Sequence, residues 1–125
     1  MIESWVINGD NLVPVSSETV QGVLRSRIDS GLRETWLASS SGRSLAFVTN
    51  TERAMVILLE EEGDPGGHAT DTGAEGTSSG FVLSNGQYDE YPDQDTVPIR
   101  EAFELIEHIL GTGSWPAGAR WAADR

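Results

Sequence analysis

One segment organises the predicted fold: Ser84-Asn85-Gly86-Gln87-Tyr88-Asp89-Glu90-Tyr91-Pro92-Asp93-Gln94-Asp95-Thr96-Val97-Pro98. Asn85-Gly86 between two strand-like runs favours a type I′ hairpin turn, because both central residues need positive φ and these residue types tolerate it best. The incoming strand is residues 81–83, and the outgoing strand, residues 87–91, stops at Pro92, which lacks a backbone donor. Pro98 suits the first position of a helix, where its missing N–H is not needed.

Apolar residues at helical spacing predict two helices. The first helix has its cap at Ser16 or Ser17 and ends at Ser30-Gly31, where glycine tolerates a left-handed cap. Its stripe comprises Val20, Val23, Leu24 and Ile28. The second helix begins at Pro98 and ends at Gly111 or Gly113, and its stripe comprises Ile99, Ala102, Phe103, Ile106, Ile109 and Leu110.

Extended runs predict the strands. Besides the hairpin they are residues 5–7, which lead into a turn at residues 8–11, and residues 35–38, 45–49 and 54–59. Residues 54–59 are apolar at every position, which predicts the central strand, with both faces covered. These elements indicate an α+β fold: an antiparallel sheet of about five to six strands with two helices, one N-terminal and one C-terminal to the main strand block.

Two further segments complete the predicted organisation. Residues 60–79 are mostly Gly, Asp, Glu, Thr and Ser, so burial cannot offset the entropy of ordering them, and we expect a flexible acidic Gly-rich surface loop. The tail from Trp115 to Trp121 is aromatic enough to fold back, with Trp121 beside the sheet. We expect residues 1–125 to form a single domain, given the chain length.

Composition restricts the class of protein. The chain has no cysteine, which excludes disulfides, thiolate metal sites and cysteine nucleophiles. No run approaches the length of a membrane span and no signal peptide is evident, so we expect a cytoplasmic protein without a membrane partner. Its net charge of −12, from 20 acidic and 8 basic side chains, disfavours nucleic-acid phosphates and favours a basic partner.

The acidic residues are segregated along the chain. Ten carboxylates and no arginine or lysine lie between Arg53 and Arg100, and two tyrosines lie among them. Aromatic anchors among carboxylates suit a protein interface, although a run of charges is also typical of a solvated face. Strand alternation places Tyr88 and Glu90 on one face, with Tyr91 in the core. The candidate partner-binding residues are Glu61, Asp64, Asp71, Tyr88, Asp89, Glu90, Asp93 and Asp95.

Other kinds of site have weaker support. Asp71-Thr72-Gly73 matches the aspartic protease tripeptide, but it follows a glycine-rich stretch instead of the apolar strand that this chemistry needs. Asp64, Asp71 and Glu75, with residues 60–62 nearby, lack the ligand spacing of a calcium loop. His68 and His108 have no triad or metal spacing and are expected at the surface. We therefore expect no catalytic residue, metal, cofactor or small-molecule substrate.

The C-terminal half resembles immunity protein family one of bacterial polymorphic toxin systems. The resemblance spans about residues 35–121 and rests on the order and spacing of short motifs. They are Trp36-Leu37, Arg53, Asn85-Gly86-Gln87, Glu90-Tyr91-Pro92, Val97-Pro98, Ala102, Gly111-Thr112-Gly113, Pro116 and Arg120-Trp121. The resemblance implies a small cytosolic α+β antitoxin without enzymatic activity. Such a protein binds and blocks a cognate toxin domain, often a nucleic-acid deaminase, by stoichiometric protein–protein inhibition.

Two other functions remain open at this point. The first alternative is a small acidic adaptor or regulatory domain that binds a basic protein unrelated to toxins. The second is a hydrolase that uses the acidic loop. A gene directly upstream for a large secreted protein ending in a short toxin domain would favour the immunity function over the adaptor.

Overall fold

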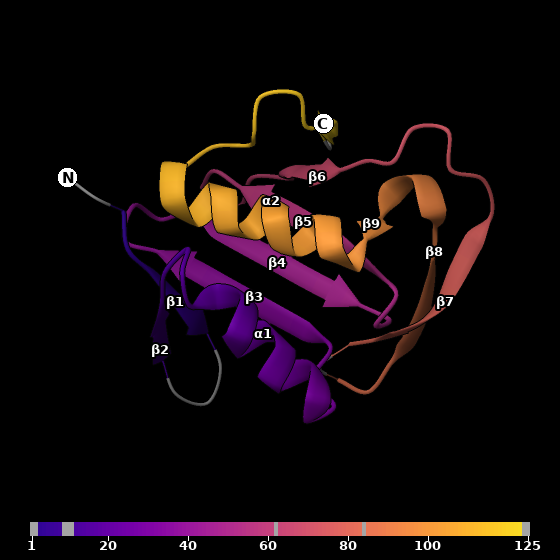
Figure 1. Cartoon of the computed structure of the whole chain (residues 1–125), viewed down its shortest axis with the longest axis horizontal. Helices are drawn as coiled ribbons and strands as arrows, with labels where there is room; N and C mark the ends of the chain where they lie inside the picture. The colour runs from indigo at the N-terminus through magenta and orange to yellow at the C-terminus, as the bar shows by residue number, and fades with distance from the viewer. Residues whose placement is uncertain (1–2, 9–11, 62, 84, 124–125) are drawn as a thin grey trace.

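The computed structural model of the chain describes residues 3–8, 12–61, 63–83 and 85–123 (Figure 1). Residues 9–11 of the turn predicted at 8–11 lie outside these ranges, as do Glu62 and Ser84. The helices are α1 (Val20–Asp29) and α2 (Ile99–Thr112), and a 3-10 turn, η1, covers Asp93–Asp95. The strands are β1 (Trp5–Asn8), β2 (Leu12–Val15), β3 (Glu34–Ser39), β4 (Ser44–Thr49), β5 (Arg53–Leu59), β6 (Gly67–Ala69), β7 (Thr77–Val82), β8 (Tyr88–Pro92), β9 (Val97–Pro98) and β10 (Trp121–Ala123).

The strands form one large sheet and one hairpin. The main sheet has the order β10-β6-β5-β4-β3-β1-β2, with β9 added beside β5, and β7 pairs with β8 alone. Every pairing is antiparallel, so the α+β class is confirmed. The estimate of five to six strands was too low, because β2, β6, β9 and β10 have four residues or fewer. Such short strands carry no periodic signal of their own.

The predicted order, with one helix before and one after the strand block, is only partly correct. In the sequence α1 stands between β2 and β3, and α2 is followed by β10. The central strand was also predicted wrongly, since β4 lies in the middle of the sheet order and is buried on both faces from Leu45 to Thr49. In β5 burial alternates between buried and half-buried residues, so only one of its faces is fully covered.

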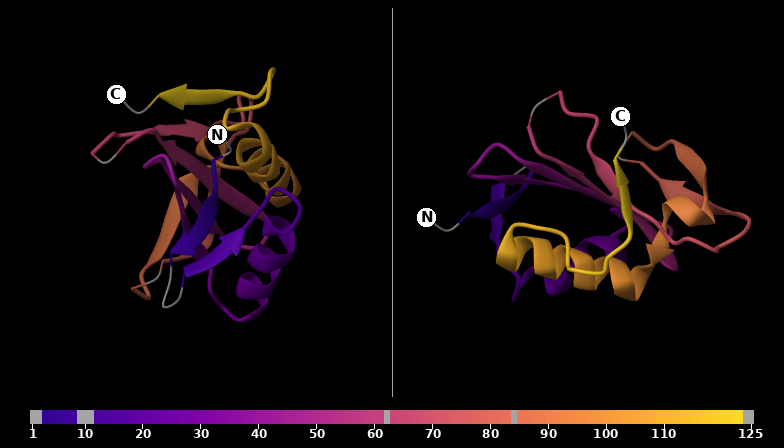
Figure 2. Two further views of the ribbon diagram at one scale, coloured as in Figure 1. Left: turned by 90° about the vertical axis from the view of Figure 1, so that its left-hand side faces the viewer. Right: turned by 90° about the horizontal axis from the view of Figure 1, so that it is seen from above.

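The main sheet separates two unequal layers. Figure 2 shows α1 and α2 on one face of the main sheet and the β7/β8 hairpin on the opposite face. Alternation sends Leu45 and Phe47 of β4 toward the helices, where Phe47 stacks on Phe103 of α2 with ring centroids 5.6 Å apart. The alternate residues Ala46 and Val48 are also buried but point to the opposite face of the sheet. The principal core therefore lies between the sheet and the helices.

Both helices follow their predicted apolar stripes, with small differences at the ends. Val20 and Leu24 of α1 are completely buried, but the cap residue is Thr19, and Ser16 instead begins the turn that precedes it. Pro98 is extended and pairs with Arg53 as part of β9, so α2 begins one residue later than predicted. Neither helix in the described ranges is long and apolar enough to cross a membrane.

The hairpin turn differs in type from the prediction. The Leu83 N–H donates to the Gln87 carbonyl, and the Gly86 N–H donates to the Leu83 carbonyl, both at 2.9 Å. Three residues therefore lie between the bonded pair, which is not the two-residue type I′ loop. Gly86 has a φ of 87°, so the expected need for glycine at this position holds.

Residues 60–79 do not form the irregular loop that their composition predicted. They contain β6 and the first residues of β7, and β6 lies between β5 and β10 in the main sheet. Ala69 is almost fully buried, and the Thr70 N–H donates to the Arg120 carbonyl. Pairing with β5 and with the distant C-terminal tail supplies the contacts that the segment's own side chains lack.

Candidate protein-binding surface

Arg53, the first residue of β5, binds two of the predicted partner-binding carboxylates. Its Nη2 donates to Asp71 Oδ2 at 2.6 Å and to the Asp93 carbonyl at 3.2 Å, and its Nε donates to Thr96 Oγ1 at 2.7 Å. The Asp93 carboxylate lies 4.0 Å from the same guanidinium and also accepts a hydrogen bond from Ser78. Asp71 and Asp93 are therefore primarily parts of an internal ion-pair network.

Asp95 forms a second pair beside this network. Its Oδ1 lies 3.0 Å from Nε2 of His68 on β6. The expectation that His68 is a surface residue was wrong, because only 16% of its side chain is exposed, against 39% for Asp95. Asp71, Asp93 and Asp95 are thus brought together around η1, where each carboxylate accepts a hydrogen bond or forms an ion pair within the protein.

The β7/β8 hairpin has an inner and an outer face, as the alternation predicted. Tyr88 is 76% exposed, and Glu90 lies exposed on the same outer face. On the inner face the Tyr91 hydroxyl donates to Asp89 Oδ2 at 2.9 Å. The Tyr91 ring meets the buried Phe81 edge-on at a centroid distance of 4.9 Å. Tyr88 and Glu90 are therefore available to a partner, whereas Asp89 supports the hairpin.

The surroundings of Tyr91 change its acidity. Burial, the hydrogen bond to Asp89 and the negative charges of Asp89 and Glu34 together raise the pKa of Tyr91 from 10.0 to about 12. Each of these effects disfavours the phenolate. The hairpin therefore keeps Tyr91 a neutral hydrogen-bond donor to a higher pH than an ordinary tyrosine.

The remaining predicted residues, Glu61 and Asp64, lie elsewhere. Both follow the end of β5, whereas the Arg53 network lies at its beginning, and seven strand residues span roughly 20 Å. Glu61 is exposed, and Asp64 Oδ2 accepts a hydrogen bond from the Glu60 N–H at 2.9 Å. The predicted partner-binding residues therefore do not form one continuous group, because they lie near the two ends of β5 and on the β7/β8 hairpin.

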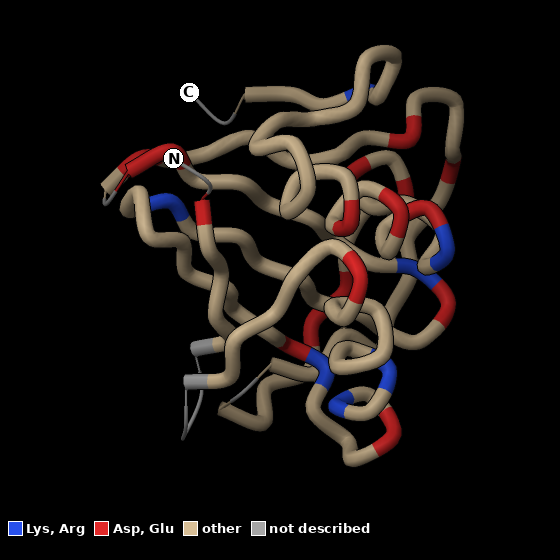
Figure 3. The backbone as a smooth tube through the Cα atoms, turned by 60° about the vertical axis from the view of Figure 1, so that its left-hand side comes forward, with Lys and Arg blue, Asp and Glu red and all other residues tan. Residues whose placement is uncertain are grey.

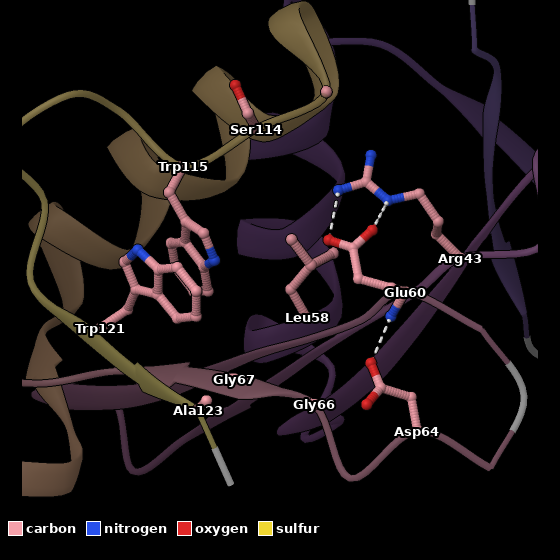
Figure 4. Close-up of a pocket in the computed structure, with 11 residues that line it drawn as sticks. Arg43, Leu58, Glu60, Asp64, Gly66, Gly67, Ser114, Trp115, Trp121 and Ala123 are labelled. Carbon is pink, nitrogen blue, oxygen red and sulfur yellow. Dashed lines mark hydrogen bonds and ion pairs between the residues drawn. The ribbon is translucent and has the colours of Figure 1, made fainter. Parts of the chain in front are cut away.

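A pocket of about 400 Å³ lies between the end of α2 and the edge of the main sheet (Figure 4). Trp115 and Trp121 stack along one side, with ring centroids 5.6 Å apart and planes inclined by 11°. Arg43 lines the opposite side, where its Nε donates to Glu60 at 2.9 Å. The sequence predicted only that Trp121 packs beside the sheet, although the Gly66-Gly67 pair and the tryptophans of the tail were signals for the pocket.

Arg43 also holds the N-terminal segment. Its Nη1 donates to Glu3 Oε1 at 3.0 Å, and the hydroxyl of Ser41 donates to the same carboxylate. Burial raises the pKa of Glu3, but hydrogen bonds from Ser41, Ser39 and Arg43 and the charge of Arg43 outweigh it, so that the pKa lies below its ordinary value. The ion pairs of Arg43, the residue before β4, therefore join this turn to the segment before β1 and to the turn after β5.

Neither models of known protein families nor curated protein sequences match this chain. Among the described residues, no group of three or more His, Asp or Glu side chains is arranged to hold a metal ion. What the geometry provides is an acidic surface with exposed aromatic side chains, which is suited to binding another protein.

Proposed function

We propose that this protein is an immunity protein that binds a cognate polymorphic toxin domain and inhibits it stoichiometrically. The toxin domain in this proposal is a nucleic-acid-targeting deaminase with a basic surface. The observation that carries the proposal is the outer face of the β7/β8 hairpin, where Tyr88 is 76% exposed beside the exposed carboxylate of Glu90. The resemblance of residues 35–121 to immunity protein family one supports the same function.

Charge supports the choice of partner. An enzyme that acts on nucleic acid binds phosphates with arginine and lysine, and carboxylates on an inhibitor complement the same side chains. A net charge of −12 attracts such a surface over a distance limited by salt screening. By occupying the basic surface, the immunity protein excludes the nucleic acid without catalysing any reaction.

Titration of enzyme activity tests this function. The toxin domain encoded directly upstream would be purified, and its deamination of a nucleic-acid substrate measured with increasing amounts of the protein. We expect activity to fall to zero at one equivalent. Full activity in the presence of an excess would overturn the proposal, and tight binding to a basic protein without toxin activity would favour an adaptor.

Tyr88→Ala tests the aromatic anchor of this surface. Loss of a hot-spot tyrosine accelerates dissociation, and a cost of about 2 kcal/mol corresponds to roughly 30-fold in affinity. Leu32→Ala is a matched control, since Leu32 is a 48% exposed apolar residue that follows α1, outside the hairpin. Equal dissociation rates for the two variants would show that Tyr88 is not an anchor.

A further inference from the structure

The sheet face opposite the helices carries an apolar strip that the hairpin does not cover. Pairing aligns Trp36 with Ala46 and Ala46 with Ile57, so these residues form one row across β3, β4 and β5. The neighbouring row runs through Val6, Ala38, Ser44 and Leu59. We call the accessible apolar members of the two rows the Trp36 strip: Val6, Trp36, Ala38, Ile57 and Leu59.

Trp36 is the exposed centre of this strip. Its side chain is 39% exposed, although β3 is an interior strand with β1 and β4 on either side. The hairpin covers the adjacent part of the face, where Phe81 is completely buried and the Asn50 side chain donates to the Ser79 carbonyl at 3.0 Å. A large aromatic side chain left exposed within a sheet, among other apolar residues, is typical of an interaction site.

Acidic residues border the Trp36 strip at both ends. Glu34 lies two residues before Trp36 and therefore on the same face, and Asp95 is paired with His68, which continues the Trp36 row beyond Ile57. At the other end Leu59 is followed by Glu60, which is paired with Arg43, and then by the exposed Glu61. The basic groups nearby, Arg43, Arg53 and His68, each form an ion pair or hydrogen bond with a carboxylate. The border is thus acidic around an apolar centre.

We propose that the Trp36 strip is the surface on which a basic segment of the toxin domain docks, and this inference rests on the proposed function. An apolar or aromatic side chain of that segment packs on Trp36, and flanking arginine or lysine residues pair with the acidic border. An apolar centre with a charged rim is the usual arrangement of a protein interface. A second copy of this chain fits less well, because two acidic borders would then face each other.

Two measurements test the docking surface. In the first, affinity for the purified toxin domain is measured for Trp36→Ser and, as a matched control, for Trp121→Ser, which removes a 48% exposed tryptophan of the edge strand β10. We expect at least a tenfold loss of affinity for Trp36→Ser, as for a tryptophan hot spot, and less than a threefold change for the control. Circular dichroism and melting temperature verify that both variants fold.

The second measurement uses the unaltered protein, so it does not depend on how the variants fold. Hydroxyl-radical oxidation should modify Trp36 in the free protein and spare it in the complex, with Trp121 oxidised in both. If the toxin domain binds but Trp36 remains oxidised and Trp36→Ser binds normally, the docking surface is wrong while the proposed function stands. If the toxin domain does not bind at all, both fail. If sedimentation shows a dimer of the free protein that Trp36→Ser abolishes, the Trp36 strip binds a second copy of this chain and not a basic partner.

Discussion

At the scale of single residues, Arg53 determines what two acidic side chains do. Its guanidinium donates hydrogen bonds to the Asp71 carboxylate and to the backbone carbonyls of Asp93 and Thr96. It therefore joins β5 to η1 and to the segment after β6. The hydrogen bonds of a partly buried arginine with several acceptors contribute more to stability than a single exposed ion pair does. Substituting Asp71 or Asp93 would therefore disturb the fold as well as the surface charge.

Gly86→Val tests the backbone of the hairpin turn. Gly86 has a φ of 87°, and a β-branched residue there is strained by on the order of 1 to 3 kcal/mol. Gly22 of α1 provides the control, because it has no positive φ and open space around its Cα. Gly22→Ala should stabilise the protein by up to about 1 kcal/mol. Urea denaturation measures both effects, and an unchanged midpoint for Gly86→Val would contradict the turn geometry.

The raised pKa of Tyr91 predicts a loss of stability at high pH. Below pH 10 the phenol is neutral in both the folded and the unfolded chain, so its stabilising effect is fully present. Between pH 10 and about 12 the unfolded chain loses this proton while the folded protein keeps it, and stability falls as pH rises. Tyr91→Phe should remove this part of the pH dependence.

The titration itself can be observed directly. Tyr88→Phe leaves Tyr91 as the single tyrosine, so phenolate absorbance reports on one group. We expect a midpoint near pH 12 while far-UV circular dichroism remains native. A midpoint near the ordinary value of 10 would mean that Asp89 and Glu34 do not act on Tyr91 as described.

At the scale of secondary-structure elements, β10 depends on a glycine in β6. A Cβ on Gly67 would lie 2.8 Å from Trp121 Cε3, so the indole lies against bare backbone. The same ring stacks on Trp115, which follows α2. The absence of a side chain at Gly67 therefore allows the C-terminal strand and the tail after α2 to close one side of the pocket.

Gly67→Ala should consequently destabilise the attachment of β10. Overpacking of this kind costs about 1 to 3 kcal/mol, and the Trp115–Trp121 stack should loosen, with a change in near-UV circular dichroism. In a Trp121→Ala background the same substitution should cost less than about 0.5 kcal/mol, because the clashing ring is gone. Equal costs in both backgrounds would show that the indole does not limit the space at Gly67.

At the scale of the whole molecule, some carboxylates are paired within the protein and others are exposed to solvent. Figure 3 shows few basic positions along the backbone against many acidic ones. The carboxylates of Asp71, Asp93 and Asp95 are bound within the protein, whereas Glu61 and Glu90 are exposed. Exposed charges steer the approach of a partner, so Glu61 and Glu90 are the better positions for testing electrostatic attraction.

Glu61→Lys combined with Glu90→Lys should slow association with the basic toxin domain. Steered association reaches roughly 10⁸ M⁻¹s⁻¹ at low salt, against about 10⁵ to 10⁶ without steering, so we expect a reduction of tenfold or more and a weaker salt dependence. Glu18→Lys with Glu104→Lys makes the same change of net charge at exposed positions elsewhere. Association rates would be measured by stopped flow across a salt series. An equal fall for both pairs of substitutions would show that only the net charge matters and not the positions of Glu61 and Glu90.

The sequence by itself determined the elements that have their own local pattern. Strands β3 to β5 follow from extended apolar runs and both helices from apolar periodicity, and the outward Tyr88 and inward Tyr91 follow from alternation along β8. Each of these signals lies within a window of a few residues, where backbone geometry alone decides which side chains share a face.

Only the tertiary structure decided which acidic residues are available and which short segments become strands. Arg53 and Asp71 are 18 positions apart, and His68 and Asp95 are 27 apart, so neither pairing has a local signature. The strands β6, β9 and β10 form because distant segments supply their hydrogen-bond partners. The exposure of Trp36 likewise depends on where the hairpin lies over the sheet. These features arise from contacts between remote parts of the chain, whose formation depends on the packing of the whole domain.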